Sequence, residues 1–273
     1  MPRIINQLNQ QLQADLQLIN HKSLNNTFVG YSQLFQQSIF VKQFVKKQAY
    51  LTEKNVTNQL NDRVLTGFPL NDSFILVLED WSPKDIKQQI NSKLAFEMGV
   101  VLGDFHLKVQ PFPGIKVVKN QFDNYLAEIN TFCESSYKKR LKELVNKFLP
   151  YKNEIQSKLS AHSNYVLHGD VGIRNYKYIF GKLMLIDFEK ARLGPVYQDF
   201  IKLFYQDFAM DDKLIQAFLK GYSTKNSDYQ LSELTRQYLI FTTAIGIFNY
   251  TETIEDIAFR NIGEKMLETI EKE

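Results

Sequence analysis

A chain of 273 residues is long enough for one large domain or two small lobes with a sizeable core. Hydrophobic residues make up 44% and charged residues 23%, which is ordinary for a soluble globular protein. The net charge of +3 is mild and is spread along the chain, so no nucleic acid partner is expected.

Cysteine usage and hydropathy narrow the class further. The one cysteine, Cys133, can form neither an internal disulfide nor a metal cluster with other cysteines. No basic segment followed by an apolar run opens the chain, so no secretory signal is expected. The most apolar stretch, YLIFTTAIGIF, has 11 residues against the roughly 20 that a membrane span needs, and predicts a buried helix. We therefore expect a cytoplasmic enzyme or binding protein, monomeric or homodimeric, with no membrane span.

Up to about residue 80 the pattern favours short strands. The segment INQLNQQLQADLQLIN is interpreted as a polar helix face. Runs rich in Phe, Val and Ile, separated by Asn, Gln, Gly and Pro, predict strands at 28–34, 38–44, 63–70 and 73–80. Between the second and third runs, a helix is predicted over 49–60, with Leu51, Val56 and Leu60 on one face. These elements predict a small sheet with one helix packed on it.

After Trp81-Ser82-Pro83 the apolar spacing becomes helical. Helical stretches are predicted from Leu94, Leu141 and Leu214 onward, and a hairpin is predicted in NYKYIFGKLMLIDF, with Gly181-Lys182 as its turn. The fold class is therefore α+β, with a small antiparallel N-terminal lobe and a larger, mainly helical C-terminal lobe. We place the small lobe at 1–80, a hinge at 81–83, and the larger lobe at 84–273.

Two acidic residues follow apolar, strand-like runs. Asp170 and Asn175 lie in VLHGDVGIRN, and Asp187 follows 12 residues later in LMLIDFEKA. Phosphoryl transfer requires magnesium, positioned charge and an oriented acceptor hydroxyl group. Asp170 is suited to orient that hydroxyl and accept its proton, and the oxygens of Asn175 and Asp187 are suited to hold Mg²⁺.

A lysine would complete this set by pairing with nucleotide phosphates. Lys42 interrupts the apolar run IFVKQF, an unusual place for a charge, although a lysine that extends to the surface is the alternative. Glu53, in the predicted helix, is the candidate ion-pair partner of Lys42, and a solvated glutamate is an equal alternative. For Glu189 the sequence allows two interpretations, a residue close to the metal or one without a role in the site.

At these residues the chain resembles a known family. HGDVGIRN, together with IDFEKARLGPVYQDF, resembles the aminoglycoside phosphotransferase and choline kinase group of protein-kinase-like enzymes. FVGYS, SIFVKQF, ILVLEDW and MGVVLGDFHLK match further parts of the pattern in order. The catalytic loop pattern His-Gly-Asp-x-x-x-x-Asn is present from His168 to Asn175. The resemblance implies a bilobal protein-kinase-like fold.

The resemblance also implies roles for further residues. His168 and Asp199 are expected to support the loop structurally. The hinge backbone from Glu79 to Trp81 is expected to bind the base of ATP, with GTP as the alternative nucleotide. NHKSLNNTF has no glycine where protein kinases have a glycine-rich loop. Its side chains and amides are therefore expected to bind the phosphates, namely those of Ser23, Asn25, Asn26 and Thr27.

The sequence thus predicts a Mg²⁺-dependent phosphotransferase that moves the γ-phosphate of ATP to a hydroxyl of a small molecule, of aminoglycoside, choline, sugar or amino-alcohol type. The main alternative is a nucleotide-binding pseudokinase or regulatory binding protein. The presence of Lys42, Asp170, Asn175 and Asp187 together argues against it, because a chain released from catalysis has no need to keep all four.

A protein kinase is the third and least favoured interpretation. Asp199 follows Asp187 by only 12 residues and no Ala-Pro-Glu follows, so little chain remains for a peptide platform. Spare length lies instead at 109–163 and in the C-terminal helices. There the stretch FNYTETIEDIAF offers groups to a polar or cationic acceptor, a solvated helix face being the alternative: Asn249, Tyr250, Glu252, Glu255 and Asp256.

Overall fold

The computed structural model describes residues 2–19, 25–117, 122–162 and 164–272. Contacts divide the chain into two compact units, Met1–Ile86 with Lys177–Ala191, and Lys87–Tyr176 with Arg192–Glu273. The predicted lobes differ from these units because the hairpin at 177–191 groups with the N-terminal residues. Pairing of β6 (Lys84–Asp85) with β8 (Tyr176–Ile179) accounts for this grouping. The lobe boundaries at 81–83 stay a prediction.

The first unit is built on an antiparallel sheet with the strand order β1-β2-β3-β5-β4. Its strands are β1 (Ala14–Leu18), β2 (Asn26–Ser32), β3 (Gln37–Phe44), β4 (Val64–Leu70) and β5 (Ser73–Glu79). The four strands predicted from the sequence correspond to β2 to β5 and are confirmed. Two helices, α1 (Pro2–Leu12) and α2 (Lys47–Leu60), accompany the sheet.

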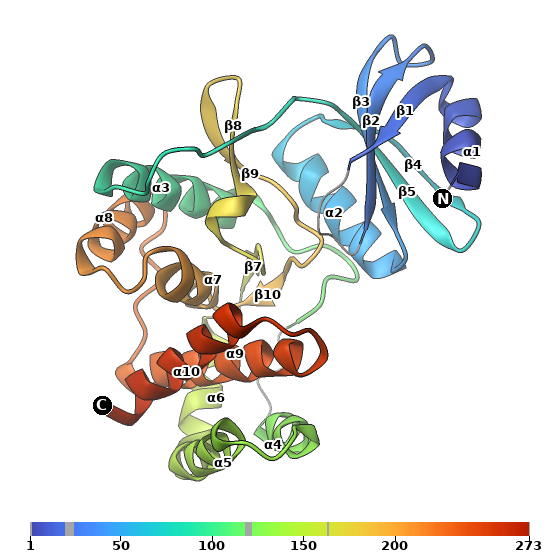
Figure 1. Ribbon diagram of the computed structural model, residues 1–273. Coiled ribbons are helices and arrows are strands. Elements are labelled where there is room, and N and C mark those ends of the chain that lie inside the picture. The colour runs from blue at the N-terminus through green and yellow to red at the C-terminus, as the bar shows by residue number, and fades with distance from the viewer. Residues whose placement is uncertain (1, 20–24, 118–121, 163, 273) are drawn as a thin grey trace. The chain divides into compact units, whose positions relative to one another are not determined.

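The two helices cover opposite faces of this sheet (Figure 1). Side chains alternate between the faces along each strand. Ile39 and Val41 of β3 therefore pack with Leu8 and Leu12 of α1. On the other face a second cluster forms beside α2, made of Phe44, Tyr50, Leu76 and Leu78. The two-residue period of β3 thus assigns position 42 to the α2 face.

Three details of this unit differ from the sequence-based expectations. The polar N-terminal segment is a helix only to Leu12 and then forms strand β1, because Leu16 completes the core on the α1 face. The helix predicted over 49–60 extends from Lys47 to Leu60, but its buried face carries Tyr50, Glu53 and Val56, while Leu51 is 37% exposed. The sheet consequently carries two helices instead of one.

The predicted hairpin forms a small sheet of its own. It contains β8 and β9 (Lys182–Leu185), and β6 pairs with β8. The turn residues are Phe180 and Gly181, with φ of 50° and 76°, and not Gly181-Lys182 as predicted. A two-residue turn in which both φ values are positive matches the right-handed twist of the flanking strands. The turn therefore starts one residue earlier than the glycine signal indicated.

The second unit is mainly helical, and the predicted helices lie within α3, α5 and α8. Its helices are α3 (Ser92–Lys108), α4 (Phe122–Thr131), α5 (Ser136–Phe148), α6 (Lys152–Ala161), α7 (Tyr197–Lys202), α8 (Asp212–Ser223), α9 (Glu233–Thr253) and α10 (Ile257–Lys272). A short antiparallel pair joins β7 (Tyr165–Leu167) to β10 (Arg192–Gly194). Five helices in the described ranges begin after a side chain that accepts a hydrogen bond from the first turn: Asn91, Ser135, Asp211, Ser232 and Asp256.

The core of this unit surrounds α9. Tyr238, Phe241, Ile245 and Phe248 of the stretch predicted as a buried helix are at most 2% exposed and pack with α4, α5, α6 and α10. No helix in the described ranges is long and apolar enough to cross a bilayer.

Helices α3 and α8 approach each other closely through glycines. A methyl group built on Gly99 would overlap the carbonyl oxygen of Phe218, and one on Gly221 would overlap that of Phe96. The absence of side chains at these two positions lets the helix backbones meet. This contact sets the lengthwise alignment of α3 with α8.

Candidate functional site

Lys42 is held on the α2 face of the first sheet. Its side chain is buried, with 6% of the residue exposed, and its ammonium nitrogen lies 5.0 Å from the centroid of the Phe44 ring. Ion pairs balance this buried charge. The Nζ of Lys42 lies 2.5 Å from Oδ1 of Asp187, 3.1 Å from Oε2 of Glu189 and 3.6 Å from Oε2 of Glu53. The predicted pair with Glu53 is thus present, and two further acids share the same lysine.

This cluster of three carboxylates and one lysine shifts the pKa of its members. Burial opposes the charge of Lys42, but the charges of Glu53, Asp187 and Glu189 outweigh it and raise the pKa of the ammonium group. Burial also raises the pKa of the Glu53 carboxyl, which the charge of Lys42 only partly offsets because Asp187 and Glu189 act against it. The cluster therefore carries more negative than positive charge.

Asp187 lies in the irregular segment that follows β9. Its φ is 69°, in the left-handed region that aspartate tolerates better than most residues. The side chain is 39% exposed, whereas Glu53 is almost fully buried. Asn25 donates a hydrogen bond to Oε2 of Glu189. An exposed carboxylate in a cluster with excess negative charge is a suitable ligand for a divalent cation.

The raised pKa of Glu53 predicts a pH dependence of stability. A carboxyl group with a raised folded-state pKa stabilises the protein fully below its unfolded pKa, near 4.5. That contribution is lost as the pH rises through the pKa of this carboxyl group in the folded protein. We expect the unfolding free energy of the wild type, minus that of Glu53→Gln, to fall as the pH rises above about 4.5. Urea denaturation of both proteins across a pH series measures this difference, and a rising difference would contradict it.

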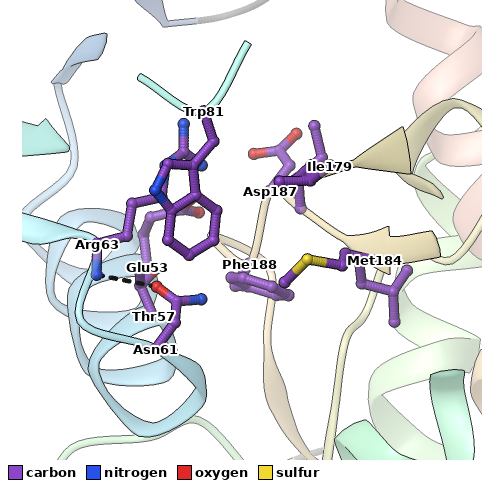
Figure 2. A pocket seen from close by; sticks show the side chains of 11 residues that line it. Glu53, Thr57, Asn61, Arg63, Trp81, Ile179, Met184, Asp187 and Phe188 are labelled. Atoms are coloured by element: carbon purple, nitrogen blue, oxygen red, sulfur yellow. Dashed lines mark hydrogen bonds between the residues drawn. The ribbon is translucent and has the colours of Figure 1, made fainter. Parts of the chain in front are cut away.

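A pocket lies beside this cluster, within the first unit (Figure 2). One side of the pocket is lined by Glu53 and Thr57 of α2 and by Asn61, which follows the last residue of α2. The other side is lined by Ile179 and Met184 of the hairpin. Trp81 also lines the pocket. The centroid of its ring lies 5.4 Å from the guanidinium carbon of Arg63 and 5.8 Å from the centroid of the Phe180 ring. The predicted nucleobase-binding residue Trp81 is therefore part of an aromatic and cationic wall.

Two other residues predicted to bind the nucleotide, Glu79 and Asn26, form hydrogen bonds within the first unit. The backbone of Glu79 hydrogen bonds in both directions with Arg63, whose Nε donates to the carbonyl oxygen at 2.7 Å. The amide of Asn26 donates to Oε1 of Gln43 across strands β2 and β3, at 3.0 Å. Ser23 lies outside the described residues.

The second unit holds the His168–Asn175 loop. Gly169 has a φ of 82°, a conformation that few other residues adopt. Nδ1 of His168 accepts a hydrogen bond from the backbone N–H of Asp170 at 3.3 Å, and Asn175 donates to the carbonyl oxygen of Asp170 at 2.8 Å. Both side chains therefore hold the backbone around Asp170.

Asp199, at the start of α7, braces the other side of this loop. Its carboxylate accepts hydrogen bonds from the backbone N–H groups of His168 and Gly169, at 2.6 and 2.9 Å. Nε2 of His106 donates to it at 3.0 Å, and Nδ1 of His106 lies 2.8 Å from the hydroxyl of Tyr222. Burial favours the neutral form of Asp199, but the hydrogen bond from His106 and nearby positive charge hold its pKa below the usual value.

Loss of this brace is expected to destabilise the second unit. Asp199→Ala leaves two buried backbone N–H groups and His106 without their acceptor, so the unfolding free energy should fall by about 3–5 kcal/mol. Because the folded pKa of Asp199 is lowered, the difference from wild type should shrink as the pH falls through that value. Urea denaturation measures both effects. The exposed Asp72→Ala is the control, and an equal effect of the two variants would contradict the assignment.

Two cations contact the carboxylate of Asp170. Nζ of Lys202 lies 2.5 Å from Oδ1, and a guanidinium nitrogen of Arg174 lies 2.7 Å from Oδ2. Asp170 itself is 5% exposed. Lys202 directly precedes a π-helical turn, Leu203–Asp207, a feature common at functional sites. Neither cation was singled out from the sequence.

Solved structures share this architecture. The aminoglycoside phosphotransferase APH(4)-Ia superimposes with a TM-score of 0.71 at 9% identity, over 99% of this chain and 98% of its own. Choline kinase LicA from Streptococcus pneumoniae superimposes with a TM-score of 0.67 at 15% identity, over 100% of this chain and 99% of its own. Amicoumacin kinase hAmiN, in complex with AMP-PNP, Ca²⁺ and Ami, has a TM-score of 0.64 at 15% identity, over 94% of this chain and 88% of its own. The chain has the protein-kinase-like fold of these small-molecule kinases. No family model and no curated protein matches the sequence.

On this kinase-like fold the candidate residues separate into two groups. Lys42, Glu53 and Asp187 are joined by ion pairs in the first unit, while Asn175 donates a hydrogen bond to the backbone of Asp170 in the second. Among the described residues no group of three or more His, Cys, Asp or Glu is arranged to hold a metal ion. Mg²⁺ is usually bound by one or two carboxylates plus substrate phosphates. Asp187 in the first unit and Asn175 in the second each offer an oxygen of the kind that Mg²⁺ prefers.

Proposed function

We propose that this chain is a Mg²⁺-dependent phosphotransferase that moves the γ-phosphoryl group of ATP to a hydroxyl group of a small molecule. The observation that carries the proposal is the Lys42 cluster. A buried lysine paired with Glu53 and Asp187 has no structural advantage over an apolar side chain, because buried ion pairs contribute little net stability. Its retention is explained if Lys42 binds nucleotide phosphates.

Each residue has a proposed role. Lys42 pairs with the phosphates, and Glu53 holds Lys42 in place. Trp81 and the neighbouring backbone bind the nucleobase, with Ser23 and Asn26 on the phosphate side. Asp187 and Asn175 would hold Mg²⁺, which neutralises charge on the phosphates when bound.

Asp170 acts on the acceptor. Its carboxylate accepts the proton of the acceptor hydroxyl, whose oxygen forms a bond to the γ-phosphorus while the bond to the β-phosphate oxygen breaks. ADP leaves with the electron pair of that bond. His168 and Asp199 act through the loop backbone, as positioning residues.

Enzymes of similar structure support the chemistry, since they have been solved in complexes with ADP, AMP-PNP, spectinomycin and hygromycin B. We further propose that residues 1–80 form the nucleotide-binding lobe and that 84–273 form the catalytic lobe. We propose a cytoplasmic monomer or homodimer without nucleic acid partners, in keeping with the mild net charge of +3.

The test is an ADP-release assay with Mg²⁺, ATP or GTP, and a library of hydroxyl compounds. Acceptor-dependent ADP formation is expected, with phosphate recovered on the small molecule. Nucleotide binding without any turnover would favour a pseudokinase, and label transferred only to protein would favour a protein kinase.

The two candidate metal ligands are expected to differ in strength. Asp187→Ala should abolish the Mg²⁺-dependent part of nucleotide affinity, while Asn175→Ala should weaken it less, because a carboxylate carries a formal charge and an amide only a dipole. Calorimetry with AMP-PNP, with and without Mg²⁺, measures this difference. Unchanged Mg²⁺ dependence in Asp187→Ala would place the metal elsewhere.

A further inference from the structure

A second pocket lies next to Asp170, within the second unit. Residues 170–174 of the loop line it together with Lys202, Gln206 and Asp207. It contains two acids and two bases, so its formal charge is balanced. The two bases, however, use a smaller share of their hydrogen-bonding groups than the two acids do. This difference indicates which ligand the pocket accepts.

Both acids of the pocket have strong partners. Each carboxylate oxygen of Asp170 accepts a short hydrogen bond from a cation, Lys202 on one and Arg174 on the other. Asp207 accepts the backbone N–H of Ile173 at 3.0 Å, and its partial burial raises the pKa of its carboxyl group. Asp170 therefore offers no uncompensated negative charge to a ligand, and the negative charge of Asp207 is opposed by the nearby charges of Lys202 and Arg174.

The two bases keep most of their donors. A guanidinium group has five N–H donors and an ammonium group three. Within the described ranges, Arg174 and Lys202 each donate one hydrogen bond, to Asp170. The Arg174 side chain is 66% exposed, and Lys202 rests above the Phe259 ring, 5.5 Å from its centroid. The remaining donors surround the carboxylate at which the acceptor hydroxyl is proposed to bind.

We propose that the acceptor carries an acidic group, a carboxylate or a phosphate, close to the hydroxyl that is phosphorylated, and that Arg174 and Lys202 bind it. This inference rests on the proposed function and specifies its substrate class. The arginine fork matches the paired oxygens of such a group. The ammonium group of an amino alcohol can accept no hydrogen bond from the unused donors of Arg174 and Lys202, so it gains no such pairing. The acidic group forms no covalent bond in the reaction. An anionic acceptor replaces the cationic aminoglycosides and choline as the expected class.

The binding test uses three probes that share a diol and differ in charge: glycerate, glycerol and 3-amino-1,2-propanediol. Each is titrated into nucleotide-free protein and into protein saturated with Mg²⁺ and AMP-PNP, by calorimetry or ligand-observed NMR. Glycerate should bind about tenfold more tightly than the other two, the effect of one charge-assisted hydrogen bond. Equal binding of the three probes, or preference for the amine, would overturn the proposal.

Variants assign the preference to the two cations. Arg174→Gln and Lys202→Gln should each remove most of the preference for glycerate, while Lys220→Gln, at an exposed lysine of α8, should keep it. Lys202→Arg retains the charge and should retain the preference, which separates loss of charge from loss of folding. If the glutamine variants weaken AMP-PNP and leave glycerate unchanged, the cations serve the γ-phosphate and the proposal is wrong.

Turnover gives a second readout. In the ADP-release library, acceptor-dependent activity should be confined to hydroxyl compounds with an acidic group, and Arg174→Gln should raise KM more than it lowers kcat. Comparable turnover of a cationic amino alcohol would refute the substrate class while leaving the phosphotransferase function intact. Absence of AMP-PNP binding would instead refute the proposed function, and the probe titrations in nucleotide-free protein would still decide the charge preference.

Discussion

Asp170→Asn is expected to reduce phosphoryl transfer by about 10²–10⁴-fold while AMP-PNP binding is preserved. The substitution keeps the size of the side chain and one oxygen acceptor, but removes the group that accepts the hydroxyl proton. Steady-state ADP release and AMP-PNP calorimetry on the same preparations measure the two properties separately.

Asp207→Asn is the matched control, because it removes a charge from the same pocket while its amide oxygen can still accept the N–H of Ile173. Its loss of transfer should be far smaller. Full activity in Asp170→Asn would refute the assignment of Asp170. Equal losses in the two variants would attribute the effect to the charge of the pocket as a whole.

Lys42→Ala is expected to have two large effects. Removal of the lysine leaves Glu53, Asp187 and Glu189 without their shared counter-charge, so the unfolding free energy should fall by about 3–5 kcal/mol. Nucleotide affinity should fall as well, because the group proposed to bind the phosphates is gone. Urea denaturation and AMP-PNP calorimetry measure these effects, with the exposed Lys46→Ala as the control.

A double variant separates the causes. In Lys42→Ala combined with Glu53→Gln, a buried unpaired charge is also removed, so part of the lost stability should return while nucleotide affinity stays low. A stability of Lys42→Ala equal to that of Lys46→Ala would show that the ion-pair cluster does not form in solution.

Local sequence patterns were sufficient to predict most of the regular structure. Strands β2 to β5 and the helices around Leu94, Leu141 and Leu214 follow from the period of their apolar residues. Strand β1 was missed because polar glutamines dominate its segment, and only tertiary packing shows that Leu16 is a core residue. The hairpin turn was shifted because Phe180 adopts a positive φ that a glycine-based rule does not anticipate.

The candidate site was predictable only where residue type and motif coincide. Asp170, Asn175 and Asp187 stand out because polar groups follow apolar runs, and Lys42 because it interrupts one. Lys202 and Arg174 look like ordinary surface cations in the sequence. One spacing is informative: Lys202 lies three residues after Asp199, one helical turn along α7. Arg174 lies four residues after Asp170, but in a loop, where this spacing predicts no contact. Only the contacts with Asp170 show that this spacing matters.

The glycine contact between α3 and α8 has a consequence for mutational screens. His106 on α3 and Tyr222 on α8 meet beside that contact, and His106 holds Asp199, which in turn holds the backbone of His168 and Gly169. A methyl group at Gly99 would force the helices apart and displace His106 with them. A screen for lost activity should therefore recover substitutions at Gly99 and Gly221, where no ligand is expected to bind, alongside those that alter charged groups.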